Sequence, residues 1–367
     1  MVIKIGGNMN HIEVQSIQTP YGYKENFWVI DGKELPEYLN MWASESQDAY
    51  LKSIDSFFGL CPAWSKELDF KGDIRFVWKL VGMESAVLPL LLCADDLDFS
   101  CIVIVVEVEK TKDFAYWRRI GYVLHENEDF EEEKKCGILY LDSYSDADWE
   151  KYGDNIALET VGSYAWEQWI SANWEEELYR RRMNYTKPFY QKEGNVCWIK
   201  NVEWVFDKYE YDEMVKCFWE METMNQLQNF ADNDVLNIQK CANMLADLTS
   251  DGRKILEEHV KDFNEILLHV LAGDLVTEPL IDLFMHHMDR KMEIRIYCKA
   301  IEVMWKNGDD EVVNVVDVTI LERLSDEACV WQRFGTFLSE EFRNYINNEV
   351  LGFNLMMGGV KPLGVKY

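Results

Sequence analysis

The stretch that decides the fold reads Leu88-Pro89-Leu90-Leu91-Leu92-Cys93, then Ala94-Asp95-Asp96-Leu97-Asp98-Phe99-Ser100, then Cys101-Ile102-Val103-Ile104-Val105-Val106-Glu107-Val108. The five β-branched residues from Ile102 to Val106 disfavour a helix and favour a strand. Because the run is short and apolar on both faces, we expect a central strand that is covered on both sides. Residues 119–124 predict a second strand close behind it.

The sequence on either side of this stretch predicts further strands. Residues 12–17 and 27–30 have the composition of short strands. Polar and apolar residues alternate over 74–80, which predicts a half-buried strand. Residues 196–199 and 202–206 predict a closing pair of strands.

The pattern changes after about residue 207, where β-branched runs nearly vanish. Glycines and capping residues then separate five predicted helices, at about residues 235–248, 251–272, 275–306, 309–324 and 326–348. We therefore predict an α+β chain of two domains. The first is a tryptophan-rich domain with a mixed α/β sheet over residues 1–222, and the second is an all-α helical bundle over residues 223–367.

The chain of 367 residues carries a formal net charge of −29, spread over both halves of the sequence. A surface this acidic disfavours nucleic acid and anionic membranes as partners, since both attract positively charged proteins. It favours a cationic partner, or it serves solubility without a specific partner. The hydrophobic content of 48% suffices for folded domains.

Nine cysteines are scattered singly through the chain. None belongs to a CxxC motif or lies at metal-ligand spacing from a histidine. Unpatterned thiols fit a reducing compartment, and no apolar run has the length of about 20 residues that a membrane span requires. We therefore expect a cytoplasmic protein that has no cofactor and does not associate with membranes.

Two features predict a surface for a partner. The first is a run of six carboxylates in eight positions, Glu126, Glu128, Asp129, Glu131, Glu132 and Glu133. It could clamp a basic partner or form a solubilising loop. The second is a set of tryptophans, Trp149, Trp166 and Trp169, of which the last two share a helical face. They could line an exposed aromatic groove or pack in the core.

Two groups of residues could hold a metal. Asp95, Asp96 and Asp98 follow an apolar run, and their oxygens could bind a divalent cation or simply turn the chain. A second group, Glu258, Asp262, Glu265 and His269, has the spacing of one stripe on the predicted 251–272 helix. The apolar residues of that helix fall on the opposite stripe, so we expect the second group to be a solvated face.

Four phrases resemble sequences of immunity proteins from bacterial polymorphic toxin systems. In the first domain these are FWVIDGKELP at 27–36 and WEKYGDNIA at 149–157. In the second domain, residues 265–275 and 314–322 are similar to small helical families of the same kind. The resemblance implies a stoichiometric inhibitor that binds one cognate toxin and blocks its active site or its substrate channel. It carries over no catalytic residues.

We expect a non-catalytic protein that neutralises a cognate, basic protein toxin. A toxin that acts on an anionic substrate carries a basic cleft, which an acidic inhibitor can occupy. One alternative is a metal-dependent hydrolase that uses Asp95, Asp96 and Asp98, and another is an intracellular scaffold with a peptide-binding helical domain. The sequence contains no phosphate loop, GxSxG or HExxH motif, so it makes no positive case for an enzyme.

Overall fold

A computed structural model describes residues 9–136, 171–231, 234–249, 251–353 and 359–364. The chain divides into two compact units, Met1–Trp219 and Glu220–Tyr367. The division falls inside a helix, α9 (Lys208–Gln228), close to the boundary that the sequence predicts between residues 222 and 223. The first unit combines antiparallel sheets with helices and the second is mainly helical, so the predicted α+β class is confirmed.

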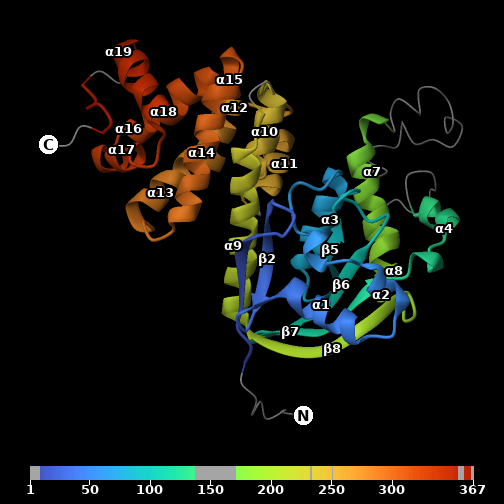
Figure 1. Ribbon diagram of the computed structural model, residues 1–367. Coiled ribbons are helices and arrows are strands. Elements are labelled where there is room, and N and C mark those ends of the chain that lie inside the picture. The colour runs from blue at the N-terminus through green and yellow to red at the C-terminus, as the bar shows by residue number, and fades with distance from the viewer. Residues whose placement is uncertain (1–8, 137–170, 232–233, 250, 354–358, 365–367) are drawn as a thin grey trace, which may run out of the picture. The chain divides into compact units, whose positions relative to one another are not determined.

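An antiparallel sheet of five strands organises the first unit (Figure 1). In spatial order the strands are β4 (Leu60–Pro62), β5 (Ser85–Cys93), β6 (Val103–Lys110), β7 (Phe114–Val123) and β8 (Val196–Asp207). The four residues Val103 to Val106 of the central strand are fully buried, which confirms the predicted covered strand. Burial on both faces explains why this strand reads as a continuous apolar run.

The predicted closing pair of strands is wrong, because residues 196–207 form the single strand β8. What separates the two apolar segments is an irregularity within the ladder. The register between β7 and β8 shifts between Trp117 and Arg119, and Glu203 adopts a positive φ of 48°. A bulge of this kind bends a strand without ending it.

A smaller antiparallel sheet precedes the large one. Its strands are β1 (Ile12–Gln18), β2 (Lys24–Ile30) and β3 (Lys33–Glu34). Asp31 and Gly32 connect β2 to β3, and both have positive φ, at 51° and 79°. That conformation is the one a two-residue hairpin requires, and it is why the sequence has Asp-Gly there.

Aromatic side chains from distant parts of the first unit form its core. Trp28 of β2 is fully buried, and its ring centroid lies 4.9 Å from that of Trp64 and 5.0 Å from that of Phe218 in α9. Trp117 of β7 lies 6.3 Å from Trp28 on another side. Rings of this size bury large apolar areas, so the cluster joins both sheets to the first part of α9.

The helices of this unit are short apart from α9. They are α1 (Leu35–Glu45), α2 (Ala49–Ser53), α3 (Lys71–Val81), α4 (Phe130–Lys135), α7 (Trp174–Arg181) and α8 (Lys187–Gln191). The predicted strand over 74–80 is wrong, since these residues lie in α3. The buried residues Phe76, Val77, Leu80 and Val81 follow helical spacing, and a window of seven residues also fits alternation.

Polar groups and a glycine bring α3 and α7 into close contact. The Gly72 N–H donates to the Glu175 carboxylate at 2.5 Å, and Arg75 pairs with Glu176 at 2.6 Å. A Cβ atom on Gly72 would lie 2.5 Å from the Glu175 carbonyl oxygen and 2.9 Å from the backbone nitrogen of Tyr179. Only glycine allows the two backbones to approach this closely.

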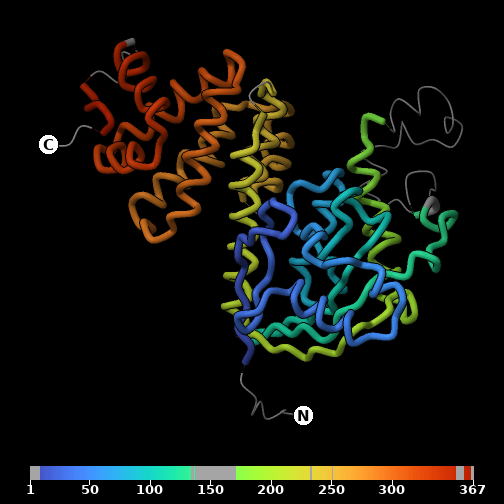
Figure 2. Tube along the Cα trace, in the orientation of Figure 1, coloured from blue at the N-terminus to red at the C-terminus, as the bar shows by residue number. Residues whose placement is uncertain are grey.

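The second unit consists mainly of helices over its described residues, and Figure 2 follows its path. Its helices are α10 (Ile238–Ala246), α11 (Gly252–Phe263), α12 (Leu268–Ala272), α13 (Glu278–His286), α14 (Lys291–Asn307), α15 (Asp310–Val315), α16 (Leu321–Ser325), α17 (Ala328–Gly335), α18 (Glu340–Tyr345) and α19 (Leu351–Phe353). Three π-helical turns, Gly273–Thr277, Val316–Ile320 and Ile346–Val350, join successive pieces into longer helices. Among the described residues, no helix has both the length and the apolar character needed to cross a membrane.

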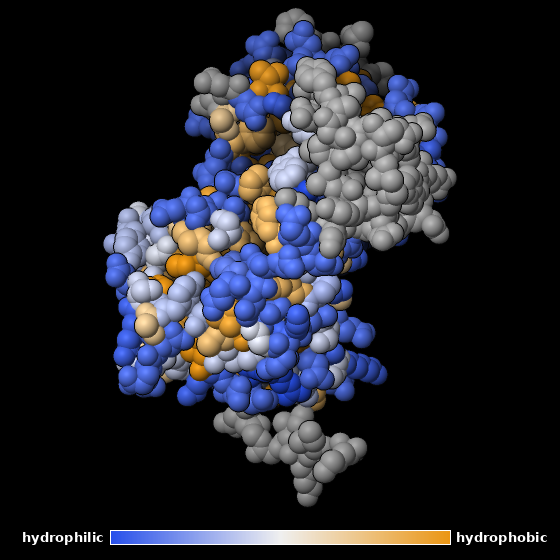
Figure 3. Space-filling model, turned by 90° about the vertical axis from the view of Figure 1, so that its right-hand side faces the viewer, coloured by the Kyte–Doolittle hydropathy of each residue, from blue (hydrophilic) through white to orange (hydrophobic). Residues whose placement is uncertain are grey.

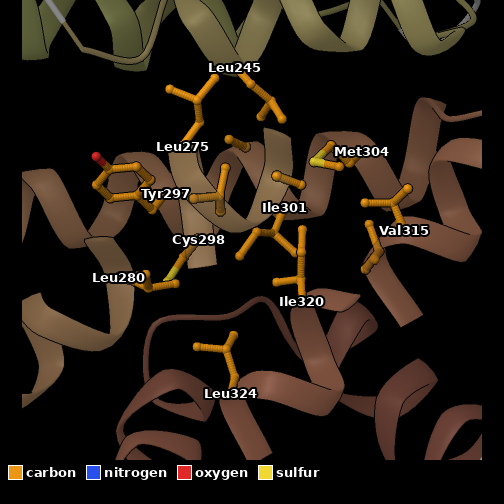
Figure 4. Packing of buried hydrophobic residues seen from close by; sticks show 14 of the residues in the cluster. Leu245, Leu275, Leu280, Tyr297, Cys298, Ile301, Met304, Val315, Ile320 and Leu324 are labelled. Carbon is orange, nitrogen blue, oxygen red and sulfur yellow. The ribbon is translucent and has the colours of Figure 1, made fainter. Parts of the chain in front are cut away.

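Helix α14 supplies much of the second core. Its residues Tyr297, Cys298, Ile301 and Met304 are buried among leucines and valines of neighbouring helices (Figure 4). The predicted single helix over 275–306 is wrong, because α13 ends at His286 and α14 begins at Lys291. The break lets the chain reverse, so that α14 can be covered by more than one neighbour.

We expect Gly72→Ala to destabilise the first unit by about 2–3 kcal/mol, because the added methyl group meets backbone atoms that cannot move independently. Gly82→Ala is the matched control. Its Cβ would lie 3.6 Å from the nearest atoms, so we expect it to be neutral or stabilising by up to about 1 kcal/mol. Chemical unfolding of both variants measures the difference, and equal stabilities would contradict the close-approach argument.

Candidate functional site

One end of the five-stranded sheet gathers the residues that could carry function. Strands β5 and β7 end there, at Cys93 and Val123, and their neighbours β6 and β8 begin there. Loop 94–102 and the segment after Val123 therefore leave the sheet on the same side. Rigid strands that end in loops are a common framework for binding sites.

The acidic segment, Glu126–Glu133, begins within the 3-10 turn His125–Asn127. It continues into the first part of helix α4. Within it Glu126, Glu128, Asp129, Glu131 and Glu132 are exposed, and Glu133 is half-buried. The Asp129 N–H donates to the Tyr185 hydroxyl at 2.7 Å, and the Asp129 carboxylate accepts the N–H groups of Glu131 and Glu132 at 3.1 Å. These bonds fix the backbone, so the carboxylates are presented from a defined surface.

Two ion pairs attach this segment to the rest of the unit. Glu128 contacts the His125 Nδ1 at 2.9 Å, and this hydrogen bond raises the pKa of His125. Glu133 contacts Arg182 at 3.4 Å. The segment therefore combines solvated carboxylates with others that hold it in place.

An exposed aromatic residue lies in the middle of the acidic segment. Phe130 is 69% exposed, and charged residues flank it on both sides in the sequence. Figure 3 faces the side of Figure 1 that carries α4 and α8, and its described surface is mostly hydrophilic with small apolar patches. An exposed aromatic ring is a side chain that can anchor a protein contact.

Arg182 links the acidic segment to a buried carboxylate. Its Nε donates to Asp73 at 2.9 Å, while the same side chain contacts Glu133. Asp73 is fully buried, and its Oδ2 has no hydrogen-bond partner. Burial raises the pKa of Asp73 to about 6, against the lowering effect of Arg182. We attribute the raised pKa of Asp73 to its unsatisfied oxygen, because the loss of water around this oxygen opposes ionisation of the carboxyl group.

Loop 94–102 brings two thiols and a carboxylate together. The Sγ atoms of Cys93 and Cys101 and an oxygen of Asp96 all lie within 4.8 Å of one another. The Cys93 N–H donates to the Ile102 carbonyl at 3.1 Å, which aligns the two cysteines across the hairpin. The Leu97 N–H donates to the Cys93 carbonyl at 3.0 Å, and this turn carries Asp96 back toward the thiols.

The three aspartates that the sequence suggests for a metal do not act together in this loop. Within the described part of the chain, the group that could hold an ion contains Asp96 but neither Asp95 nor Asp98. The Asp98 carboxylate instead accepts the Ser100 N–H at 2.8 Å and its hydroxyl at 2.6 Å. The sequence offers one signal for the cysteines, which is that they stand on either side of the polar break at 94–100 between two apolar runs.

The predicted tryptophans Trp149, Trp166 and Trp169 lie outside the described residues. Two of their neighbours in the sequence show what indole rings do in this unit. Trp204 is buried, and Arg119 lies over the ring of Trp198 at 4.0 Å. Packing and cation–π contact therefore account for these two rings.

Glu258, Asp262, Glu265 and His269 are all exposed, which confirms the expected solvated residues, but they do not form one stripe because they do not share one helix. Helix α11 ends at Phe263, and Asn264 takes a left-handed conformation with φ of 61°. Beyond that break, the His269 Nδ1 contacts the Thr319 hydroxyl at 2.5 Å. An asparagine in this conformation ends a helix as a glycine would.

Small clefts open on the surface of the described residues, and two of them are lined by charged side chains. The first, of about 160 Å³, lies beside Arg119, which pairs with Glu107 at 2.7 Å. The second, of about 190 Å³, lies in the second unit beside Trp305, where Glu302 accepts the Ser339 N–H at 2.6 Å. Arg119 and Glu302 are thus bound to groups of their own units.

Comparison with known proteins gives one similarity. Residues 242–352 match a family described as a domain of unknown function (DUF7674), and the match lies within the helical unit. No curated protein and no solved structure matches the chain. The sheet end that carries the acidic segment and the cysteine pair lies outside the matched residues.

We expect Asp73 to make stability depend on pH. Its folded pKa of about 6 exceeds the ordinary value of 3.8, so between these values the folded state binds a proton that the unfolded state lacks. The free energy of unfolding should therefore fall by about 2 kcal/mol as pH rises from 4 to 6, relative to Asp73→Asn. Urea unfolding of both proteins across this range measures it.

Asp55→Asn removes an exposed carboxylate from the same unit and serves as the control for general charge effects. We expect its free energy of unfolding to run parallel to that of the unmodified protein. A constant difference between the unmodified protein and Asp73→Asn over pH 4–7 would contradict the assignment.

Proposed function

We propose that this protein binds and neutralises one basic protein, a cognate bacterial toxin, without catalysing a reaction. The observation that carries the proposal is the acidic segment, an exposed set of carboxylates on a backbone fixed by Tyr185 and Asp129. The net charge of −29 and the resemblance of several phrases to immunity proteins support it further. The hydrolase alternative has less support, because the group of described residues that could hold an ion includes Asp96 but neither Asp95 nor Asp98.

Electrostatic attraction would raise the association rate, and side-chain packing would lower the dissociation rate. Carboxylates on an acidic protein attract a basic partner over long distances and raise the association rate. An exposed aromatic ring then buries apolar area at the contact and slows dissociation. Because hydrogen bonds already order the acidic segment, little conformational entropy is lost when the partner binds.

The first experiment identifies the partner. The product of the gene next to this one is expressed in cells with and without this protein. We expect it to be toxic alone and harmless in the presence of this protein, and to co-purify with it in equal amounts. A neighbouring product that is neither toxic nor bound would overturn the proposed function.

The charge of the acidic segment should govern the association rate. We expect the triple variant Glu126→Gln, Glu131→Gln, Glu132→Gln to associate about tenfold more slowly at low salt, with a weaker salt dependence. Its control is Glu257→Gln, Glu258→Gln, Glu327→Gln, which removes the same charge from exposed positions in the second unit. Stopped-flow binding at several ionic strengths measures both, and equal rates would contradict the role of the segment.

Phe130 should act on dissociation instead. We expect Phe130→Ala to increase the dissociation rate about tenfold or more and to change the association rate little, because ring burial follows the electrostatic encounter. Phe263→Ala is the matched control, since this phenylalanine is also exposed, at 46%, but lies in α11. An unchanged dissociation rate for Phe130→Ala would place the contact elsewhere.

A further inference from the structure

We propose that Cys93, Asp96 and Cys101 bind one zinc ion at the end of the five-stranded sheet. The site is distinct from the acidic segment, and the inference does not depend on the proposed function. Three potential ligand atoms within 4.8 Å of one another are its starting point. Geometry, ligand chemistry and the rigidity of the framework each support it.

The spacing of the three groups fits a tetrahedral ion. Zinc binds sulfur at about 2.3 Å and carboxylate oxygen at about 2.0–2.2 Å, so its ligands lie roughly 3.3–3.8 Å apart. Ligand atoms that already lie within 4.8 Å reach this spacing through shifts of about 1 Å. Rotations of exposed or half-exposed side chains supply such shifts without moving the backbone.

The chemistry of the donors selects the metal. Two sulfur atoms and one carboxylate oxygen suit zinc, whereas magnesium and calcium prefer sites made of oxygen alone. Binding would release the two thiol protons to solvent and leave two thiolates on the ion. Asp96 enters as a carboxylate, and no group is oxidised or reduced.

The backbone holds the ligands on a rigid element. Cys93 is the last residue of β5, and its N–H donates to the carbonyl of Ile102, which keeps the preceding residue, Cys101, close to it. The Leu97 turn adds Asp96, and the Asp69 N–H donates to the Leu97 carbonyl at 3.2 Å. Sites built on strand ends keep their geometry better than sites on loops without such bonds.

The fourth position of the ion is open to water or to a histidine that moves toward it. His125 follows β7 at this end of the sheet, and its Nδ1 contacts Glu128 at 2.9 Å. Its ring nitrogens are not among the ligand atoms that lie within 4.8 Å of one another, so the imidazole would have to rotate to reach the ion. A carboxylate on the distal nitrogen orients many zinc-binding histidines, so the fourth ligand is either water or this imidazole.

The test uses full-length protein, purified with a thiol reductant and stripped of metal by a chelator. Zinc is titrated in competition with a chromophoric chelator. We expect one ion per chain, and at least tenfold weaker binding for Cys93→Ser, Cys101→Ser and Asp96→Asn. The controls Cys329→Ser and Asp95→Asn change an exposed thiol and an exposed carboxylate, and we expect them to bind like the unmodified protein.

Cobalt(II) replaces zinc in a second measurement that needs no variant. Two cobalt–thiolate bonds should give a sulfur-to-metal charge-transfer band in the near ultraviolet and intense visible bands of a tetrahedral ion. Zinc X-ray absorption then separates the two possible fourth ligands, because a bound imidazole adds characteristic multiple scattering.

Two results would overturn the site. The first is zinc binding that Cys93→Ser and Cys101→Ser leave unchanged, together with a cobalt spectrum without the charge-transfer band. The second is a reduced protein that takes up no zinc and instead forms a Cys93–Cys101 disulfide on mild oxidation. Circular dichroism of each serine variant shows whether a loss of binding reflects the site or a loss of fold.

Discussion

The hydrogen-bonded register of β5, β6 and β7 is the constraint on which the first unit depends. It buries Val103 to Val106 on both faces and sets which strand ends meet. Loop 94–102 and the acidic segment leave the sheet at one end because the strands are antiparallel. A shift of this register by one residue would exchange the faces of β6 and separate Cys93 from Cys101. The register of these strands therefore determines both the core of the first unit and the positions of the two candidate sites.

A buried charge connects the acidic segment to that framework. Arg182 contacts Glu133 on one side and the fully buried Asp73 of α3 on the other. Removing one partner of such a contact leaves the other charge without compensation in a medium of low polarity. Gly72, one residue before Asp73, allows α7 to approach α3 and so brings Arg182 within reach. The position of the acidic segment thus rests on packing far from it in the sequence.

The sequence predicts the elements whose secondary structure follows from local residue preferences. It fails for the elements whose secondary structure depends on contacts with distant parts of the chain. Five β-branched residues identify β6, and the Asp31-Gly32 pair identifies the β2–β3 hairpin. Residues 74–80 satisfy helical and strand patterns equally, and contact with α7 decides for the helix. The carboxylates of 126–133 are evident in the sequence, whereas the link to Asp73 is not. The meeting of Cys93, Asp96 and Cys101 requires knowledge of a hairpin register, which spacing rules for metal motifs do not contain.

The π-helical turns of the second unit change the direction in which the side chains of each helix point. Each turn accommodates one residue more than a regular turn, so the helix after it is rotated by about 100° relative to an unbroken α-helix. Before Val316–Ile320, α15 packs against α10, α12 and α14, whereas after it α16 packs against α17. Helical-wheel projections drawn through such a helix mix two faces into one. Each of the three composite helices therefore presents its side chains in two orientations, one before and one after the extra residue of the π-helical turn.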